Sequence, residues 1–552
     1  MGSIMDPIIP EERLREMRHT KLWPDRLVTD YLDEAVAQRP DQVAIVDHNS
    51  MSGRSTTLSY RQLARRVDRM ALGLAALGVE PGDVVAFQLP NWWQFTALYL
   101  ACARIGAVAN PMMHIFRHRE LRFMLGFAEA KVVVVPRQFR GFNYPQMVEE
   151  LRGELPALRH VLVIEERPEG SFEEALLTRR WEDEQDGPAL FAKRRAGPND
   201  VTQLQYTSGT TGEPKGVMHT PNTLLGNLLS IIGVLGMTGQ DVMLMGSPLA
   251  HQTGFLYGML MPIVLGTKSV LMDIWNPAEA ATLIQDEGAT FTMGSTPFVA
   301  DLTDSPMAEQ RDLSTLHVFV TAGAPIPRVL VQRARERLGA HIVSAWGMTE
   351  NGAATCARLD DPPEKVFETD GAPIPGMEVR VVDGEGRPLP PGEEGRLQAR
   401  GMCNFVGYLK RPDRFDTDAE GWFNTGDLAR MDKDGYIRIS GRAKDILIRG
   451  GENVPVVEVE GVLYRHPAIQ DVAIVGMPDE RLGERGCAFV TLREGQALTL
   501  PEMVSFLESE RMARQYFPER LEVLPEMPRT ASGKIQKFRL REMATGLKPD
   551  AV

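Results

Sequence analysis

Residues 206–217 read Tyr-Thr-Ser-Gly-Thr-Thr-Gly-Glu-Pro-Lys-Gly-Val, a stretch in which seven of twelve residues are Thr, Ser or Gly. Glycines let the backbone turn sharply and bring its N–H groups close to an anion. The hydroxyl groups add further donors, and the lysine adds a positive charge. The stretch therefore predicts a loop that holds a polyphosphate through Thr207, Ser208, Gly209, Thr210, Thr211, Gly212 and Lys215.

The loop does not follow the Walker A pattern, in which a Gly-Lys pair precedes Ser or Thr. Here Lys215 follows Pro214 and precedes Gly216. The alternative is an ordinary surface turn that is rich in Gly and Thr. Because most connections in compact domains have about two to six residues, the length of this stretch and its density of donors favour the phosphate loop.

The composition is that of a large globular protein. The chain has 552 residues, of which 43% are hydrophobic and 24% are charged. This length suggests roughly three to four domain-sized units. The formal net charge is −13, which argues against a nucleic-acid partner, because proteins that bind nucleic acids usually carry a basic patch.

The sequence shows no pattern for export or for a membrane span. The four cysteines are far apart and form no C-x-x-C motif, so we expect reduced thiols in a cytoplasmic protein without structural zinc. Residues 1–15 are acidic and contain proline, unlike a signal peptide. The longest apolar stretch, 253–265, is shorter than the ~20 residues that cross a bilayer, so we expect a core helix.

Alternating strands and helices predict a mostly parallel sheet in the N-terminal half of the chain. Ser59 and Gln62 have the spacing of a capping box, and apolar residues then follow at helical spacing until Gly78. A second helix is expected over 93–103. The expected buried strands are 84–87, 132–135 and 316–320. This order is typical of βαβ units.

The pattern changes after Gly371 and again after Gly441. Short strands separated by Gly and Pro turns first predict a small antiparallel barrel or sheet. These strands are 377–382, 395–399 and 436–439. A compact α+β region follows, with a helix that Pro501 begins. Its expected strands are 472–475 and 487–492. We place the domain boundary near Lys444.

Five further segments follow one another at intervals that match one family. They are 248–255, 321–325, 346–350, 422–427 with its continuation at 441–445, and 528–537. Together with the loop at 206–217, they resemble the adenylate-forming superfamily of acyl-CoA synthetases, carrier-loading adenylation domains and luciferases. The resemblance extends from about Leu58 to Lys537, which is nearly the whole chain.

The resemblance implies an α/β fold with two domains. The first, residues 1–443, is a large N-terminal AMP-binding domain of stacked α/β subdomains plus a small β-barrel. The second, residues 444–552, is a mobile α+β C-terminal domain. Within the superfamily, segments 90–92, 251–256 and 479–484 look most like bacterial CoA ligases for short- to medium-chain or alicyclic acids, the cyclohexanecarboxylate type among them.

The resemblance also implies a reaction in two halves. A carboxylate attacks the α-phosphate of ATP, which gives acyl-AMP and pyrophosphate. The CoA thiolate then attacks the acyl carbonyl, and AMP leaves. The implied cofactors are ATP, Mg²⁺ and coenzyme A, and the implied substrate is a small-molecule carboxylic acid.

Phosphoryl chemistry needs charge neutralisation and positioning above all. By resemblance, Glu350 is the candidate Mg²⁺ ligand and belongs to the catalytic residues together with the adjacent Thr349. Thr211 is a second candidate metal contact. Magnesium prefers one or two carboxylates plus substrate oxygens, which suits this set. The alternative for Glu350 is a solvated loop carboxylate.

The remaining nucleotide contacts are expected on the ribose and the base. Asp427 would accept hydrogen bonds from the ribose hydroxyls, since an ionised carboxylate only accepts. Arg442 would add a positive contact, or would form a salt bridge at the rim. Trp346 would cover the base, or would be a core residue. The residues expected to flank the adenine are Gly323, Ala324, Pro325 and Gly347.

Lys534 is the expected catalytic residue. By resemblance it reaches from the C-terminal domain to the carboxylate and the α-phosphate during adenylation, where a compact ammonium charge suits the reacting centre. The alternative is a surface lysine in a basic tail. Acylation of Lys534 by a lysine acyltransferase would remove this charge and switch the enzyme off.

A hinge and a second face are expected in the C-terminal domain. Lys444 would absorb the rotation that follows the first half-reaction. The face that the rotation brings to CoA would contain Gly450, Gly451 and Glu452, or this segment would be a simple hairpin turn. Relatives often carry Tyr-Lys-x-Pro near 516–518, and here Arg511 or Arg514 would have to replace that lysine.

The expected acyl pocket contains mainly uncharged residues, so the acyl group is expected to be hydrophobic. These residues are His251, Phe255, Gly258, Thr296 and Met348. His251 is expected to contact the substrate and not to act as a base.

Three other functions stay open at this point. A stand-alone adenylating enzyme could load a carrier-protein thiol, although the chain continues only briefly beyond the Lys534 motif, which favours CoA. A nucleotide hydrolase would release ADP without a carboxylic acid. An AMP-binding sensor would bind nucleotide without pyrophosphate release. The chain could be a monomer or a homodimer.

Overall fold

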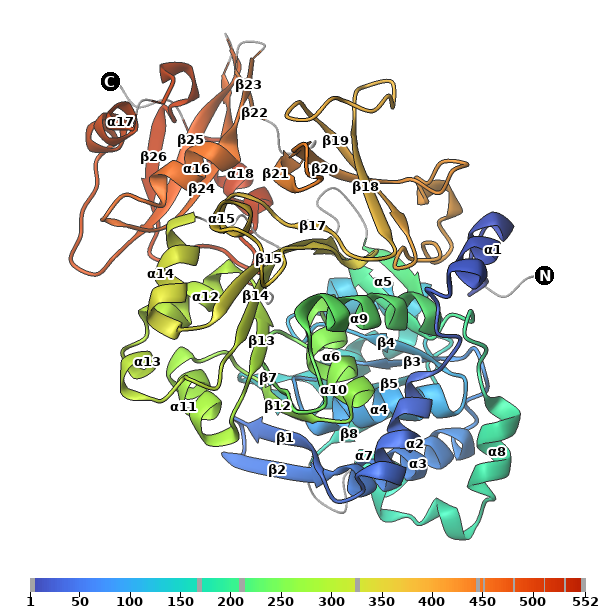
Figure 1. Cartoon of the computed structure of the whole chain (residues 1–552). Coiled ribbons are helices and arrows are strands. Elements are labelled where there is room, and N and C mark those ends of the chain that lie inside the picture. Colours follow the sequence, from blue (N-terminus) through green and yellow to red (C-terminus); the bar gives the residue numbers. More distant parts are fainter. Residues whose placement is uncertain are drawn as a thin grey trace.

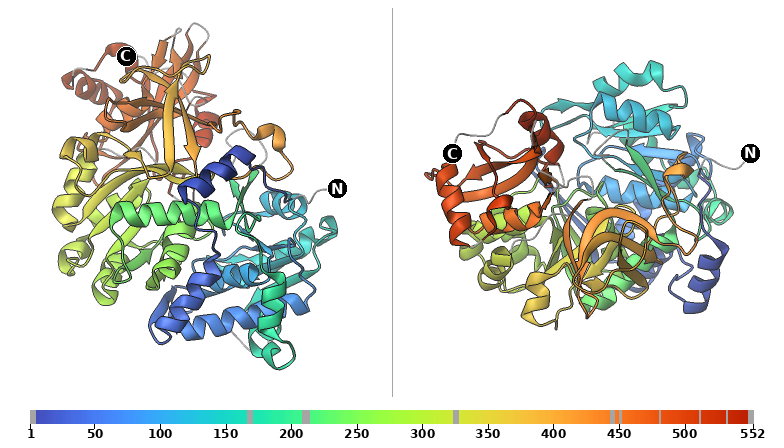
Figure 2. Two further views of the ribbon diagram at one scale, coloured as in Figure 1. Left: turned by 45° about the vertical axis from the view of Figure 1, so that its right-hand side comes forward. Right: turned by 90° about the horizontal axis from the view of Figure 1, so that it is seen from above.

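The computed structural model describes residues 5–165, 171–207, 214–322, 328–442, 447–449, 452–479, 482–510, 512–530 and 533–547. A large N-terminal part carries a smaller C-terminal part at one end (Figure 1). Figure 2 shows from two more sides that the C-terminal part, in orange and red, lies beside strands from the middle of the chain, in yellow. The expected α/β class with a large and a small domain is confirmed.

The largest sheet has nine strands in the order β17-β16-β15-β14-β13-β11-β12-β1-β2. Neighbouring strands from β15 to β1 in this order pair in parallel. At the two edges of the sheet, β2, β16 and β17 pair antiparallel. The bounds are β1 (Val43–Asn49), β2 (Arg54–Ser59), β11 (Val242–Met245), β12 (Lys268–Met272), β13 (Phe291–Gly294), β14 (Val318–Ala322), β15 (His341–Met348), β16 (Gly352–Cys356) and β17 (Ala372–Pro373). Helices α11 (Pro277–Glu287), α12 (Thr296–Asp304) and α14 (Arg328–Leu338) lie along it (Figure 1).

The strand expected from residue 316 begins later, as β14 at Val318. Leu316 instead belongs to a turn, in which its N–H donates to the carbonyl of Leu313 at 2.9 Å. Its side chain is buried all the same. The strand was predicted to begin two residues too early because Leu316, although it lies in the preceding turn, is as apolar as the strand residues that follow.

The second sheet has six strands in the order β10-β9-β4-β3-β5-β8. All neighbours are parallel except β9 and β10. The bounds are β3 (Val84–Phe87), β4 (Val108–Pro111), β5 (Val132–Pro136), β8 (His160–Ile164), β9 (Gln203–Thr207) and β10 (Lys215–His219). The predicted strands at 84–87 and 132–135 and the predicted helix, α4 (Trp93–Arg104), are confirmed.

The predicted capping box begins helix α3 (Tyr60–Ala76). Ser59 Oγ accepts from the Gln62 backbone N–H at 3.3 Å, and Gln62 Oε1 accepts from the Ser59 N–H at 2.9 Å. Gly78 follows the helix with a φ of +81°, a conformation that favours glycine. Both ends of the helix are thus those that the sequence predicts.

The third sheet contains four antiparallel strands in the order β18-β19-β20-β21. Their bounds are β18 (Met377–Val382), β19 (Glu394–Gly401), β20 (Phe423–Met431) and β21 (Ile437–Arg442). Among the described residues no pairing joins β18 to β21, so the strands form an open sheet and not a closed barrel. Of the two forms expected from the strand pattern, the structure has the sheet, and the small β-barrel that the resemblance implies is wrong for the described strands.

The C-terminal part has the expected α+β character. Its sheet has the order β23-β22-β25-β24, with β26 beside β25. The bounds are β22 (Leu447–Arg449), β23 (Glu452–Val454), β24 (Ile469–Asp479), β25 (Gly483–Leu492) and β26 (Arg520–Val523). Its helices are α16 (Val456–Leu463), α17 (Leu500–Ser509) and α18 (Lys537–Ala544). Pro501 lies in the first turn of α17, as predicted.

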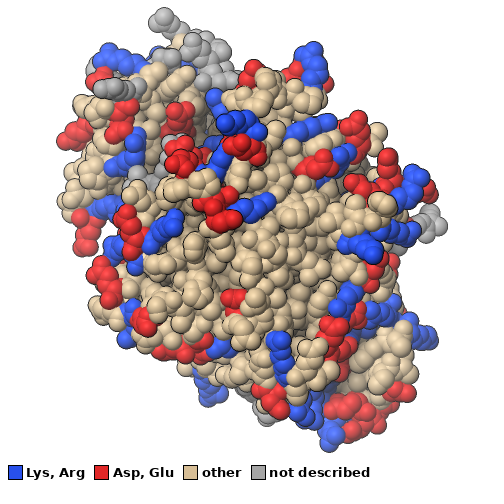
Figure 3. Space-filling model, viewed as in Figure 1, with Lys and Arg blue, Asp and Glu red and all other residues tan. Residues whose placement is uncertain are grey.

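The long apolar stretch is a buried helix, which confirms the expected core element. It consists of the π-helical segment η4 (Gly254–Leu260) and helix α10 (Met261–Leu265). Within the described parts of the chain, no helix is long and apolar enough to cross a membrane. On the face in Figure 3, basic and acidic side chains are interspersed. All four cysteines are buried, and none forms a disulfide within the described residues.

Candidate active site

The predicted phosphate loop lies between two strands that pair with each other. Thr207 ends β9 and Lys215 begins β10, and the two residues are opposite each other in the antiparallel register. The ends of the predicted loop therefore meet. Several predicted site residues lie outside the described residues, and their roles stay predictions: Ser208, Gly209, Thr210, Thr211, Gly212, Gly323, Ala324, Pro325, Lys444, Gly450 and Gly451.

Glu350 and Lys215 are connected through a tyrosine that the sequence analysis missed. The hydroxyl of Tyr408 donates to Glu350 Oε1 at 2.7 Å, and both side chains are buried, with 3% and 5% exposed. The Lys215 Nζ lies 4.6 Å from the centre of the Tyr408 ring, which is a cation–π distance. Burial and the Glu350 carboxylate raise the pKa of Tyr408, so the phenol stays a donor at neutral pH. Glu350 is therefore a buried, positioned carboxylate and not a solvated one.

Tyr408 reaches Glu350 because its segment runs alongside β10. The N–H of Met218 donates to the carbonyl of Gly407 at 3.0 Å, and the N–H of Leu409 donates to that of Gly216 at 2.8 Å. A side chain at residue 216 would press on this segment, since a Cβ there would lie 2.9 Å from Leu204 Cδ1 and 3.2 Å from Leu409 Cβ. The absence of a side chain at Gly216 thus permits the approach of this segment.

A buried histidine holds the backbone beside Glu350. The Nε2 of His219 lies 2.8 Å from the carbonyl oxygen of Thr349. Burial lowers the pKa of His219 to about 4, so the ring is neutral at physiological pH. Because a carbonyl only accepts, the proton is on Nε2. The sequence analysis missed His219, which lies two residues beyond the motif at 206–217.

Trp346 and Asp427 contact each other directly. The indole N–H donates to Asp427 Oδ2 at 2.9 Å, with 7% and 5% of the two residues exposed. Asp427 on β20 also lies opposite Arg442 on β21 in the strand register. The predicted ribose contacts are therefore neighbours, and Trp346 is a buried residue that belongs to the same site. Gly347 follows on β15.

Lys534 lies in a tight turn that packs against the N-terminal part. Its N–H donates to Thr530 Oγ1 at 3.0 Å, and its carbonyl accepts from the Thr530 N–H at 2.7 Å. Arg529 Nη1 donates to the carbonyl of Gly533 at 2.7 Å. Gly533 has a φ of +83°, and a Cβ there would be 2.5 Å from Ser295 Oγ, which follows β13. The turn is thus seated at the carboxyl end of the parallel sheet.

The structure brings Lys534 near His251, although the two are far apart in sequence. Burial, together with the nearby ammonium group of Lys534, lowers the pKa of the half-buried His251 to about 3. Its imidazole is therefore neutral and a weak base at physiological pH. This agrees with the expected contact role of His251.

Two buried hydroxyl groups lie at the same edge of the sheet without a hydrogen-bond partner among the described residues. They are Ser295 Oγ and Thr321 Oγ1, with 7% and 0% of their residues exposed. Thr321 on β14 pairs with Gly294 on β13, so the two hydroxyls come from neighbouring strands. Unsatisfied buried polar atoms are uncommon in native proteins and occur at functional sites. A bound polar group would satisfy them.

The predicted acyl-pocket residues are largely buried. Phe255 is fully buried on η4 and packs edge-to-face on Tyr99. Thr296 is buried at the start of α12. Met348 is half-buried at the end of β15 and packs against the aromatic cluster around Tyr408. Met245 fills the space beside Gly258, because a Cβ at residue 258 would lie 2.3 Å from Met245 Cγ.

The predicted CoA face is described only in part. Glu452 lies opposite Arg449 in the antiparallel β22–β23 pair, which is the pairing of the hairpin alternative. Arg514, a candidate replacement for the missing lysine, forms an exposed hydrogen bond with Glu508 Oε1 at 2.9 Å. Arg511 lies outside the described residues.

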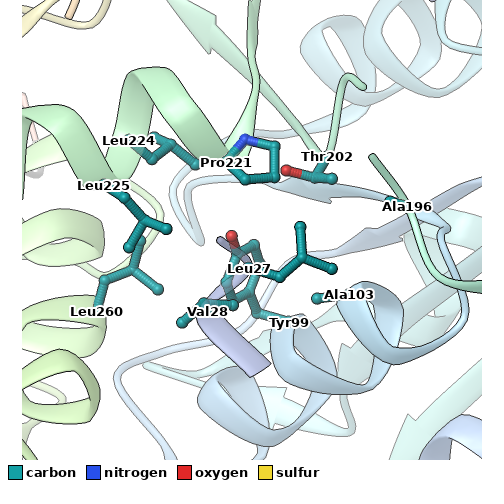
Figure 4. Close-up of a pocket in the computed structure, with 10 residues that line it drawn as sticks. All are labelled: Leu27, Val28, Tyr99, Ala103, Ala196, Thr202, Pro221, Leu224, Leu225 and Leu260. Carbon is teal, nitrogen blue, oxygen red and sulfur yellow. The ribbon is translucent and has the colours of Figure 1, made fainter. Parts of the chain in front are cut away.

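A small apolar cavity lies next to Phe255, which packs on the cavity-lining residue Tyr99. It is lined by Leu27, Val28, Tyr99, Ala103, Ala196, Thr202, Pro221, Leu224, Leu225 and Leu260 (Figure 4). None of the predicted site residues lines it. The predicted site residues that the structure describes therefore gather at the sheet edge beside the Lys534 turn and do not line this cavity.

The sequence matches the AMP-binding enzyme family over residues 32–409 and the AMP-binding enzyme C-terminal domain over residues 458–534. The chain belongs to the AMP-binding enzyme family. The order of its motifs and the approach of Lys534 to the sheet edge agree with this membership.

Similar proteins span nearly the whole chain. The medium-chain fatty-acid–CoA ligase of Escherichia coli (strain K12) is 38% identical over 96% of this chain and 93% of its own length. The 2,3-dihydroxybenzoate–AMP ligase of Bacillus subtilis (strain 168) is 33% identical over 97% of this chain and 96% of its own length. The crystal structure of ATP-bound MatB from Rhodopseudomonas palustris matches with a TM-score of 0.82 and 26% sequence identity. The match covers 94% of this chain and 99% of the MatB chain.

Family membership makes this AMP-binding enzyme an adenylate-forming acid–thiol ligase. The expected cofactors ATP, Mg²⁺ and coenzyme A are those of its family. Glu350 fits a magnesium site, because it is a buried carboxylate beside the strand that carries Lys215. Bound Mg²⁺ would neutralise phosphate charge there.

The geometry at Gly533 predicts that Gly533→Ala impairs adenylation. The left-handed backbone costs an alanine roughly 1–2 kcal/mol, and the added methyl group collides with Ser295. We expect carboxylate-dependent ATP–pyrophosphate exchange to slow about tenfold or more. Gly461→Ala on α16 is the matched control, because a Cβ there meets open space. Exchange at the wild-type rate in Gly533→Ala would contradict the docked position of the turn.

The contact of Tyr408 predicts that Tyr408→Phe raises the Mg²⁺ concentration needed for half-maximal pyrophosphate exchange several-fold. Loss of one partner of a buried charged hydrogen bond costs about 1–3 kcal/mol and frees the Glu350 carboxylate to reorient. The control is Tyr60→Phe, whose buried hydroxyl donates to the carbonyl of Thr267 at 2.7 Å, far from the site in sequence. An identical Mg²⁺ dependence in both variants would refute the positioning role.

Proposed function

We propose that this AMP-binding enzyme activates a hydrophobic carboxylic acid and transfers the acyl group to CoA. The acid would have a short or medium chain or an alicyclic ring, cyclohexanecarboxylic acid among the candidates. The observation that carries the proposal is the seating of the Lys534 turn at the sheet edge, beside the neutral His251. The E. coli relative, a medium-chain fatty-acid–CoA ligase, supports the choice of acid and of thiol.

The residues divide the work between the two half-reactions. In the first, a carboxylate oxygen bonds to the α-phosphorus of ATP, and pyrophosphate leaves with the bonding electrons. The Lys534 ammonium group stabilises the negative charge shared by the carboxylate and the α-phosphate. Asp427 accepts hydrogen bonds from the ribose hydroxyls. In the second half, the CoA sulfur bonds to the acyl carbon and AMP leaves.

Hydrophobicity of the acid is supported by the residues around the predicted pocket. Phe255 and Met348 are apolar, Thr296 is uncharged, and His251 is neutral. None of these residues would pair with a second carboxylate. Burial of apolar area would favour an alkyl or alicyclic group by about 25 cal/mol per Å².

We also propose that the C-terminal domain, residues 444–552, rotates about Lys444 against residues 1–443 after adenylation. The first matched family region ends at residue 409 and the second begins at residue 458. The proposed domain boundary between residues 443 and 444 falls between these two regions. The rotation would withdraw Lys534 and present the face with Gly450, Gly451 and Glu452 to the thiol.

A second candidate is the loading of a carrier-protein thiol. The B. subtilis relative, an aryl-acid–AMP ligase, favours keeping it. The two candidates share the first half-reaction and differ in the thiol that accepts the acyl group.

Pyrophosphate release against a panel of acids tests the proposal. We expect sustained release, with AMP as product, only when both an acid and CoA are present. The panel spans acetate to decanoate, benzoate and cyclohexanecarboxylate. We expect the rate to rise with apolar area, by about 1–3 kcal/mol of discrimination per methylene until the pocket is full. A single-turnover burst that CoA does not extend would favour carrier loading.

The assigned role of Lys534 predicts an asymmetric effect of Lys534→Ala. Adenylation should fall by at least a few hundredfold, because a preorganised charge at the reacting centre is lost. Thioester formation from supplied acyl-AMP should be largely spared. We also propose that acetylation of Lys534 by a lysine acyltransferase acts in the same way. Equal loss of both half-reactions in Lys534→Ala would contradict this division.

A further inference from the structure

Two buried side chains from different sheets meet at the predicted ribose site. Trp346 comes from β15 of the nine-stranded sheet, and Asp427 comes from β20 of the antiparallel sheet. The indole N–H donates to Asp427 Oδ2 at 2.9 Å. A hydrogen bond to an ionised acceptor is roughly twice as strong as a neutral one.

The backbone at both positions is irregular in a way that directs these side chains. The β15–β16 register shifts between Trp346 and Gly347, and the β20–β21 register shifts between Leu428 and Ala429, just after Asp427. Such bulges bend a strand and re-aim a side chain, and they are frequent next to active sites. At Gly347 a Cβ would lie 1.8 Å from the carbonyl oxygen of Gly352, so only glycine allows this bulge.

The carboxylate is fixed from its backbone as well. The N–H of Asp427 donates to Thr425 Oγ1 at 3.1 Å, and that hydroxyl donates to the carbonyl of Leu397 at 2.7 Å. With the backbone held and one carboxylate oxygen bonded to the indole, the plane of the Asp427 carboxyl group has one favoured orientation.

We propose that Trp346 is a positioning residue for ribose recognition: its indole N–H fixes the Asp427 carboxylate in the orientation that accepts the ribose hydroxyls. This inference rests on the proposed ribose role of Asp427. It gives Trp346 a function that a stacking ring alone lacks, because a phenylalanine ring could cover a base but could not hold Asp427. Trp346 then determines selectivity for a ribonucleotide over a deoxyribonucleotide.

The test compares the binding of ATP and 2′,3′-dideoxy-ATP to wild-type protein and to Trp346→Phe by isothermal titration calorimetry. We expect the variant to bind ATP about tenfold more weakly, since the carboxylate loses its fixed orientation. Binding of the dideoxy nucleotide should change less than about twofold, because it has no hydroxyls for Asp427. The preference of the protein for ATP should therefore shrink.

The matched control is Trp92→Phe. Trp92 makes a second buried indole–carboxylate bond, to Asp273 Oδ2 at 2.9 Å, outside the predicted site. We expect it to leave the ratio of the two affinities unchanged. Trp346→Leu, which also lacks a hydrogen-bond donor, is the second variant if Trp346→Phe does not fold. Thermal unfolding of each variant reports whether it folds.

An equal loss of affinity for both nucleotides in Trp346→Phe would overturn the proposal, because it would leave only stacking on the base. If wild-type protein itself binds the two nucleotides equally, the ribose role of Asp427 is wrong, and the proposal fails with it. The ratio of the affinities of wild-type protein for ATP and 2′,3′-dideoxy-ATP distinguishes a wrong ribose role of Asp427 from a wrong positioning role of Trp346. A reduced ratio in Trp346→Phe, with an unchanged ratio in Trp92→Phe, supports the proposal.

Discussion

Burial of two carboxylates is the constraint on which the rest of the site depends. Glu350 and Asp427 are each 5% exposed, and a buried charge is costly unless it is hydrogen-bonded. Each receives its bond from an aromatic side chain, Tyr408 for Glu350 and Trp346 for Asp427. Because each donor comes from a segment distant from its acceptor, the segments must pack in one arrangement for both charges to be tolerated.

This constraint accounts for the irregular backbone around the site. The segment that carries Tyr408 lies closely along β10, where residue 216 has no side chain, and the bulge at Trp346 requires that residue 347 has none. Glycine weakens strands in general, because it adds backbone entropy and nothing to pack. At Gly216 and Gly347 that cost is offset by the close approach that positions a donor for a buried carboxylate.

The sequence predicts well whatever is encoded locally. The capping box before α3 and the strands at 84–87 and 132–135 are read from neighbouring residues, and both are confirmed. The family that the motifs indicate is confirmed as well. Tyr408 and His219 were missed because their partners, Glu350 and Thr349, are distant in sequence and no local pattern records such contacts. The open antiparallel sheet was equally ambiguous, since barrel and sheet share the same strand pattern and differ only in whether the edges pair.

The unused hydroxyls of Ser295 and Thr321 argue for the place where the substrate reacts. Leaving a buried hydroxyl unpaired costs about 1–3 kcal/mol, and a bound polar group at this edge would offset that cost. Both lie at the carboxyl edge of neighbouring parallel strands, the edge at which open α/β sheets bind ligands. The Lys534 turn reaches the same edge and meets Ser295. The Lys534 turn and these two hydroxyl groups therefore make this edge polar. The hydrophobic carboxylic acid that we propose as substrate would place its carboxylate at this edge and bury its apolar part.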